Sequence, residues 1–190
     1  MRSLILLLFS GVSAFAAPFS FGVKAGVPLT DFFTDVGSLN SPFSSTTNRY
    51  IVGPTVELHL PFHLSVELDA LYRHFNYSVP SNTTTGSAWE FPLLGKYRFR
   101  GELVRPYVDA GVAWDTLSGL TQSIQTQQLE LQNNTTTGFV VGAGLEVHVP
   151  FLRLSPEFRY TRWGAQHFLD PNGGFGSNQN QAEFLLGITF

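Results

Sequence analysis

The sequence contains no cysteine, and beyond its first residues it has no run of about 18 apolar residues that could form a transmembrane helix. Without cysteine, the chain is stabilised by something other than disulfide bonds, and a lipoprotein anchor is not expected. Any part of the chain that crosses a membrane must therefore cross it as β-strands.

Charged residues are also few. They make up 13% of the chain, whereas a soluble domain carries about 25%. The net charge is −3 and the basic residues form no stripe, so nucleic acid is not an expected partner. Aromatic residues reach 14%, including 18 Phe. Part of the surface is therefore expected to face something other than water.

The first 17 residues have the layout of a secretory signal peptide. Arg2 is followed by an apolar run over 4–9 and by small residues over 14–17. This segment is too short to span a bilayer as a helix. We predict a signal peptide over 1–17 and one mature domain over 18–190, with a buried N-terminal helix or strand as the alternative to the signal peptide.

Apolar and polar residues alternate along most of the remaining chain, as they do in strands with one apolar face. In one segment, Phe91 and Leu93 share one face, while Lys96 and Arg98 share the other. Each segment is long enough to cross a bilayer, which takes about 9–11 tilted residues. The predicted strands are 19–28, 49–60, 62–76, 87–100, 104–116, 138–149, 152–163 and 181–190.

The connections between these strands alternate in length. The short ones lie around Pro61, Gly101 and Pro150, and the long ones are rich in Ser, Thr, Asn, Gln and Gly. Outer-membrane barrels have short periplasmic turns, long extracellular loops and an even number of strands. The layout predicts an all-β fold, an eight-stranded antiparallel up-and-down transmembrane β-barrel. The predicted long loops are 29–48, 77–86, 117–137 and 164–180.

The direction of the two faces distinguishes two kinds of barrel. A soluble, lipocalin-like periplasmic barrel points its apolar residues inward, whereas a membrane barrel points them at lipid. Aromatic residues near strand ends favour the membrane barrel, and so do the nearly equal numbers of acids and bases on the polar face, because buried charges need partners. Four apolar residues also lie on that polar face: Leu71, Leu94, Val140 and Leu185. Asp115 is a further acid on the polar face. The predicted interior charge network is Lys24, Glu57, Glu67, Asp69, Arg73, Glu90, Lys96, Arg98, Arg105, Asp109, Glu146, Arg153, Glu157, Arg159 and Glu183.

The terminal segment, 182–190, alternates apolar residues and ends on an aromatic residue. It resembles the closing strand of bacterial outer-membrane barrels, and the whole mature chain resembles the OmpA-type and opacity-like eight-stranded barrels of Gram-negative bacteria. The resemblance implies an integral outer-membrane location, contact with outer-membrane lipid, and recognition of the last strand by the barrel-assembly machinery. The residues that would carry this assembly signal are Phe184, Leu186, Ile188 and Phe190.

One hairpin occurs twice in the sequence. Residues 57–68 resemble residues 146–158, with one extra residue after the Pro-Phe turn in the second copy. Duplication of a hairpin explains the likeness, and so does convergence of two similar turns.

No catalytic or metal site is expected. His167 and Glu183 resemble the His and Glu of the lipid A deacylases, but Leu169 stands where that family has its Ser. His59 and His148 occupy equivalent places in the repeated hairpin, and no third ligand lies at a fixed spacing from them. We therefore expect no enzyme activity, no cofactor and no metal.

A barrel of eight strands is only wide enough for side chains to fill its interior, so an open pore is not expected. We predict a structural or surface-interaction role, in which long extracellular loops serve adhesion or recognition. In the first loop, Phe32, Phe33 and Phe43 are candidates for contact with lipid headgroups or with an extracellular ligand. The alternatives are a narrow gated pore, a lipid-modifying outer-membrane enzyme and a soluble periplasmic lipocalin-like binding barrel.

Overall fold

The computed structural model describes residues 18–30, 33–35, 50–79, 82–121, 135–164 and 175–190. The predicted signal peptide lies outside these residues. Within them, no helix is long and apolar enough to cross a membrane. The strands are β1 (Phe19–Pro28), β2 (Phe33–Asp35), β3 (Ile51–His59), β4 (Leu64–Asp69), β5 (Leu71–Val79), β6 (Asn82–Arg98), β7 (Val104–Thr121), β8 (Thr135–Val149), β9 (Leu152–Trp163), β10 (Phe175–Ser177) and β11 (Asn180–Thr189).

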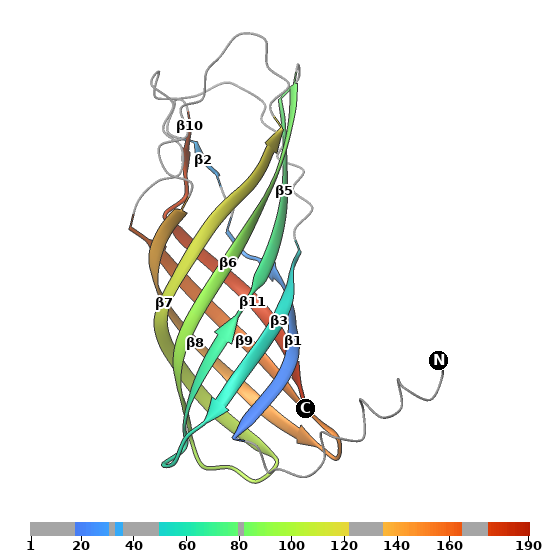
Figure 1. Ribbon diagram of the computed structural model, residues 1–190, viewed down its shortest axis with the longest axis vertical. Coiled ribbons are helices and arrows are strands. Elements are labelled where there is room, and N and C mark those ends of the chain that lie inside the picture. The colour runs from blue at the N-terminus through green and yellow to red at the C-terminus, as the bar shows by residue number, and fades with distance from the viewer. Residues whose placement is uncertain (1–17, 31–32, 36–49, 80–81, 122–134, 165–174) are drawn as a thin grey trace, which may run out of the picture.

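The wall of the barrel closes because β1 pairs antiparallel with both β11 and β3. β4 and β5 both pair with β3 on one side and with β6 on the other, and the register does not shift between them. Together they therefore form one strand of the wall. The wall then has eight antiparallel strands, and each pairs with its neighbours in the sequence. Figure 1 shows them tilted around the long axis of the molecule, with the C terminus at the end that carries the short turns. The predicted eight-stranded up-and-down barrel is confirmed.

The interruption between β4 and β5 is caused by prolines in the neighbouring strands. Ala70 donates its N–H to the Pro54 carbonyl oxygen of β3 (3.0 Å), but Pro54 has no N–H to donate in return. On the other side, the register places Pro92 of β6 opposite Asp69, where a second donor is missing. The hydrogen-bond ladder is thinned at this point, while the register continues unchanged.

Strand boundaries agree closely with the predictions for 19–28 and 152–163, which coincide with β1 and β9. Two predicted loops are wrong in extent, because their hairpins continue beyond the apolar alternation. The predicted loop 77–86 is mostly strand, with only 80–81 between β5 and β6, and the predicted loop 117–137 loses both ends to β7 and β8. These segments are rich in Thr, which favours strands through its branched side chain. A strand beyond the bilayer needs no apolar face.

A second, two-stranded sheet joins two of the long connections. β2 follows β1, β10 precedes β11, and the two pair antiparallel from Phe33–Ser177 to Asp35–Phe175. In Figure 1 this pair lies beyond the rim of the barrel, at the end opposite the C terminus. The sequence did not predict either strand, because three residues are too few to show an alternation.

The apolar face of the wall points outward. Phe91 and Leu93 of β6 are 37% and 39% exposed, whereas Lys96 on the same strand is 3% exposed and faces the lumen. Glu67 and Arg159, on other strands, are buried in the same way. This arrangement excludes the soluble lipocalin-like alternative, which requires the opposite direction.

Aromatic side chains flank the centre of this outer face on β6. Trp89 stacks with Phe91 on one side of Leu93, with 6.3 Å between the ring centroids. Tyr97 meets Phe99 edge-on at 5.2 Å on the other side. Membrane barrels carry such aromatic girdles at both interfaces. Leu93 therefore lies near the middle of the lipid-facing band.

The apolar residues that the alternation placed on the polar face are completely buried inside the barrel. They belong to two small apolar clusters, so the lumen is not filled by charged side chains alone. One cluster consists of Leu94, Ala113, Val140 and Trp163, and the other of Ile51, Leu71 and Leu185.

The two copies of the repeated hairpin fold with different registers. The first turns through three residues, 61–63, and the second through two residues, 150–151. As a result, Glu67 pairs directly with Glu57 across the first hairpin, whereas Glu157 lies farther from its own turn. The extra residue in the second copy therefore moves one carboxylate deeper into the lumen.

Gly53 lies where β3 passes very close to the β4–β5 junction. A Cβ atom at this position would lie 1.8 Å from the Ala70 carbonyl oxygen, which belongs to the backbone. We expect Gly53→Ala to lower the free energy of unfolding by about 1–3 kcal/mol, as overpacking does. Gly95→Ala is the matched control, because its Cβ would meet only the Ala110 carbonyl oxygen, at 3.7 Å. Urea titration of the refolded protein measures both, and equal stability of the two variants would contradict the close approach.

Candidate functional site

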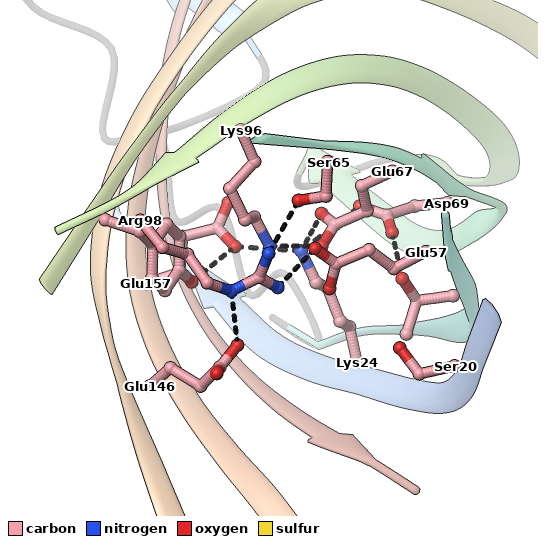
Figure 2. Close-up of polar contacts among 12 residues, drawn as sticks. Ser20, Lys24, Glu57, Ser65, Glu67, Asp69, Lys96, Arg98, Glu146 and Glu157 are labelled. Atoms are coloured by element: carbon pink, nitrogen blue, oxygen red, sulfur yellow. Dashed lines mark hydrogen bonds and ion pairs between the residues drawn. The ribbon is translucent and has the colours of Figure 1, made fainter. Parts of the chain in front are cut away.

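Six ionisable side chains from four strands meet inside the barrel and form what we call the central network. Lys24 of β1 lies 2.8 Å from Glu157 and 3.4 Å from Asp69, and it also contacts Glu67. Lys96 of β6 donates to the second carboxylate oxygen of Glu67. Figure 2 shows these side chains converging from β1, β4, β6 and β9. The members of the central network are Lys24, Glu67, Asp69, Lys96, Glu157 and Arg159.

Arg159 extends the central network across the whole width of the lumen. Its Nε donates to Glu157 (2.7 Å) and its Nη2 donates to Asp69 (2.9 Å), and its side chain is completely buried. The strands that carry Arg159 and Asp69, β9 and β4, lie on opposite sides of the closed wall. The central network has as many cations as carboxylates, so it is formally neutral.

On the side of the short turns, Arg98 of β6 holds two carboxylates. Its Nε donates to Glu146 (2.8 Å), its Nη2 contacts Glu57, and its Nη1 donates to the Ser65 hydroxyl (2.7 Å). Glu57 and Glu146 are the equivalent residues of the repeated hairpin, and both converge on one guanidinium (Figure 2).

On the side of the long loops, Arg73 of β5 is the centre of a smaller group. Its Nη2 lies 3.0 Å from Glu90 and contacts Glu183, and its Nη1 donates to Gln181 (2.7 Å). Asp115 is buried in the same half of the barrel. Carboxylates outnumber cations here, so this half of the lumen is acidic.

Uncharged side chains complete the network, and the sequence-based prediction did not include them. Thr55 donates to Asp69 (2.6 Å), and the Tyr107 hydroxyl donates to Glu157 (3.0 Å). The Lys96 ammonium also lies 4.4 Å from the centre of the Tyr107 ring. Alternate residues of a strand point to the same face, and both of these residues lie at positions that point inward. This alternation was the signal that could have identified them.

Three residues of the predicted interior network have no ionic partner within the part of the chain that the structure describes. Asp109 is 5% exposed, and neither of its carboxylate oxygens has a hydrogen-bond partner there. Arg105 and Arg153 are half-buried at the end with the short turns, where Arg105 donates to the Gly101 carbonyl (2.8 Å) and Arg153 lies 3.1 Å from His59. The expectation that every inward charge would be paired does not hold for these three.

The weak candidates for catalysis and metal binding gain no support from their positions. Glu183 is held by Arg73, and His167 lies outside the described residues. His59 and His148 both lie at the end with the short turns. Among the described residues, no three His, Cys, Asp or Glu side chains are grouped so as to hold a metal ion.

The last strand combines an outward apolar row with an inward acid. Phe184, Leu186, Ile188 and Phe190 are exposed on the outer face of β11, while Glu183 is buried in the lumen. The model of one protein family, the outer membrane protein beta-barrel domain, matches residues 3–190. The chain belongs to this family. It is an integral protein of the bacterial outer membrane.

Solved structures of other outer-membrane barrels share this fold. Neisserial surface protein A superposes with a TM-score of 0.61 and 16% identity, over 91% of this outer-membrane barrel and 96% of that chain. OprG of Pseudomonas aeruginosa gives 0.62 and 13%, over 90% and 92% of the two chains, and outer membrane protein W of E. coli gives 0.55 and 15%, over 93% and 98%. At such identities the likeness establishes the fold. No curated protein matches the sequence significantly.

Proposed function

We propose that this outer-membrane barrel is a closed, non-conducting anchor that holds its extracellular loops at the cell surface for adhesion or recognition. The observation that carries the proposal is the contact between Arg159 and Asp69, which joins opposite walls of the lumen. Lys24 adds contacts to β4 and β9 at the same level. A narrow gated pore would have to separate these buried ion pairs, and leaving a buried charge without its partner costs several kcal/mol.

The extracellular end supports a role in surface contact. The β2–β10 sheet joins the connection after β1 to the connection before β11, so two loops far apart in the sequence are held together (Figure 1). β5 and β6 pair as far as Val79 and Asn82, so their hairpin reaches beyond the barrel wall at this end (Figure 1). One neighbour in fold, neisserial surface protein A, is named for its place at the cell surface.

The partners in this proposal follow from the faces of the barrel. Outer-membrane lipid covers the apolar outer face, and the barrel-assembly machinery binds the last strand through its outward row at Phe184, Leu186, Ile188 and Phe190. An extracellular ligand binds the loops. The proposal includes no enzyme activity, cofactor or nucleic acid.

Planar-bilayer recording tests the closed lumen. The refolded protein is expected to give no single-channel current at either polarity, because the central network fills the lumen with side chains. A variant in which residues 122–134 are replaced by a short Gly-Ser linker is the matched control. It is expected to be silent too, which shows that the block lies in the lumen and not in this loop. Discrete current steps from the wild-type protein would overturn the proposal in favour of a gated pore.

Attachment assays test the surface role. Bacteria that display the wild-type protein are expected to attach to at least one of three surfaces, coated with protein, polysaccharide or lipid. The loop-replaced variant is expected to lose this attachment while it keeps the heat-modifiable gel migration of a folded barrel. Attachment equal to that of cells without the protein, on all three surfaces, would contradict the surface role.

A further inference from the structure

Two of the short turns carry an exposed phenylalanine at their tip. Phe62 lies between β3 and β4, and Phe151 lies between β8 and β9, both turns at the end of the barrel that carries the C terminus (Figure 1). The two side chains are 85% and 90% exposed, more than any other large apolar side chain in the described part of the chain. Side chains this exposed contribute little to the packing of the barrel.

The first of these turns holds its phenylalanine in a strained backbone conformation. Phe62 and His63 are its two central residues, and their φ angles of 66° and 65° lie in the left-handed region. Hairpins with such a turn usually have Asn and Gly at these positions, because bulky side chains are unfavourable there. The turn therefore keeps an exposed phenylalanine where that residue costs stability in the protein alone. Backbone strain of this kind concentrates at sites of contact and function.

The sheet register places Phe62 beside the aromatic girdle. β4 and β6 pair as far as Leu64 and Tyr97, so Phe62 and Phe99 lie two residues further along the same register. Tyr97 and Phe99 are the edge-on pair that flanks the lipid-facing band at this end. Phe62 thus lies at the level of side chains that face the membrane, two residues beyond the outward-facing Leu64.

Phe151 continues a lipid-facing row in the same way. On β8, Leu145 and Val149 are exposed on the outer face, and Phe151 follows Val149 at the spacing of two residues that keeps side chains on one face. Leu103, in the third short turn, lies only one residue before the outward-facing Val104, so it does not continue an outward row. The phenylalanines of the other two turns extend the lipid-facing surface past the ends of the strands.

We propose that Phe62 and Phe151 insert into the headgroup–acyl boundary of the phospholipid leaflet on this side of the membrane and fix the depth of the barrel. Continuity with the lipid-facing band favours lipid over a periplasmic protein, because each phenylalanine lies only two residues, about 7 Å along a strand, from a residue that faces lipid. Apolar and aromatic side chains are favourable at this boundary. The proposal does not depend on the role of the extracellular loops.

Urea unfolding of the refolded protein in phospholipid vesicles tests the anchors through the sign of one effect. Asn adopts the left-handed conformation more readily than Phe, so Phe62→Asn would raise the urea midpoint if the turn faced water. Contact with lipid reverses the sign, and Phe62→Asn and Phe151→Asn are each expected to lower the midpoint, because each removes a buried apolar side chain. Leu103→Asn is the matched control and is expected to leave the midpoint unchanged.

Fluorescent labelling locates the tips directly. The chain has no cysteine, so Phe62→Cys, Phe151→Cys and the control Glu102→Cys each take a single environment-sensitive NBD label. Glu102 is exposed in the short connection between β6 and β7. Nitroxide groups on the acyl chains of the vesicle lipids are expected to quench the labels at positions 62 and 151 and to leave the label at position 102 bright. Heat-modifiable migration shows that each variant is folded.

Either measurement can overturn the proposal. A midpoint that stays the same or rises in Phe62→Asn would show that the first turn faces water. Labels at positions 62 and 151 that are quenched no more than the label at position 102 would show the same for both turns. The vesicles contain no other protein, so tips that serve a periplasmic protein would also give unquenched labels and would overturn contact with lipid.

Discussion

Replacing Arg159 by Met is expected to lower the free energy of unfolding by about 3–5 kcal/mol, the range for removal of one partner from a buried ion pair. Arg159 is completely buried and donates to Glu157 and Asp69. Without it, the central network has one carboxylate in excess, and the two carboxylates that lose their donor are buried. Urea unfolding in lipid vesicles, followed by gel migration and tryptophan fluorescence, measures the loss.

Two further variants make this test specific. Arg162→Met, on the same strand, removes an exposed arginine that binds Asn180 (2.6 Å), and it is expected to change stability by less than about 1 kcal/mol. Adding Asp69→Asn to Arg159→Met restores the balance of charge and is expected to recover part of the lost stability. If Arg159→Met unfolds at the same urea concentration as the wild-type protein, the central network does not stabilise the barrel.

Replacing Leu93 by Arg is expected to lower the free energy of unfolding by about 2–4 kcal/mol, the cost of placing arginine on the lipid face near the bilayer midplane. Leu93 faces outward between two pairs of aromatic side chains on β6. The same urea titration in vesicles measures this loss, and the folded fraction after refolding gives an independent value.

Leu103→Arg is the control for that substitution. Leu103 is 65% exposed in the short connection between β6 and β7, beyond the lipid-facing band, so an arginine there is expected to change stability little. Equal losses from the two variants would mean that stability is lost because the leucine side chain is removed, and not because a charge faces lipid.

The direction of each side chain could be predicted from the sequence because a strand has a period of two residues. Parity alone placed Lys24, Glu67 and Arg159 inside the barrel and Phe91 and Leu93 outside. The same alternation placed the apolar residue Leu94 on the inner, mostly polar face, and the structure shows Leu94 fully buried there. Within each strand, geometry therefore overrides the preference of a single residue.

The partners inside the lumen could not be predicted, because they depend on how the strands are staggered around the wall. Arg159 meets Asp69 from the opposite side of the barrel, at a sequence separation of 90 residues. Nothing in the alternation of either strand sets their relative height. The repeated hairpin shows the same effect, since a turn shorter by one residue moves Glu157 away from the place that Glu67 takes in the first copy.

The predicted loops 77–86 and 117–137 were too long, because backbone pairing between the strands continues beyond the alternation of apolar and polar residues. β6 begins at Asn82 and β7 runs to Thr121, well beyond the last regular apolar residue of each. Alternation records contact with lipid, whereas pairing requires only backbone groups and a residue that tolerates the extended conformation. The sequence therefore predicts the height of the lipid-facing band better than the length of the strands.

The pairing of β1 with β11 means that the first and last strands of the domain share the final seam of the wall. A chain that is shortened by proteolysis, or still being exported, has two open edges, at β1 and at β9. Such edges pair readily with other chains. The wall thus loses both open edges only when β11 pairs with β1 and with β9, so a single strand provides both the closure of the barrel and its protection against edge-to-edge association.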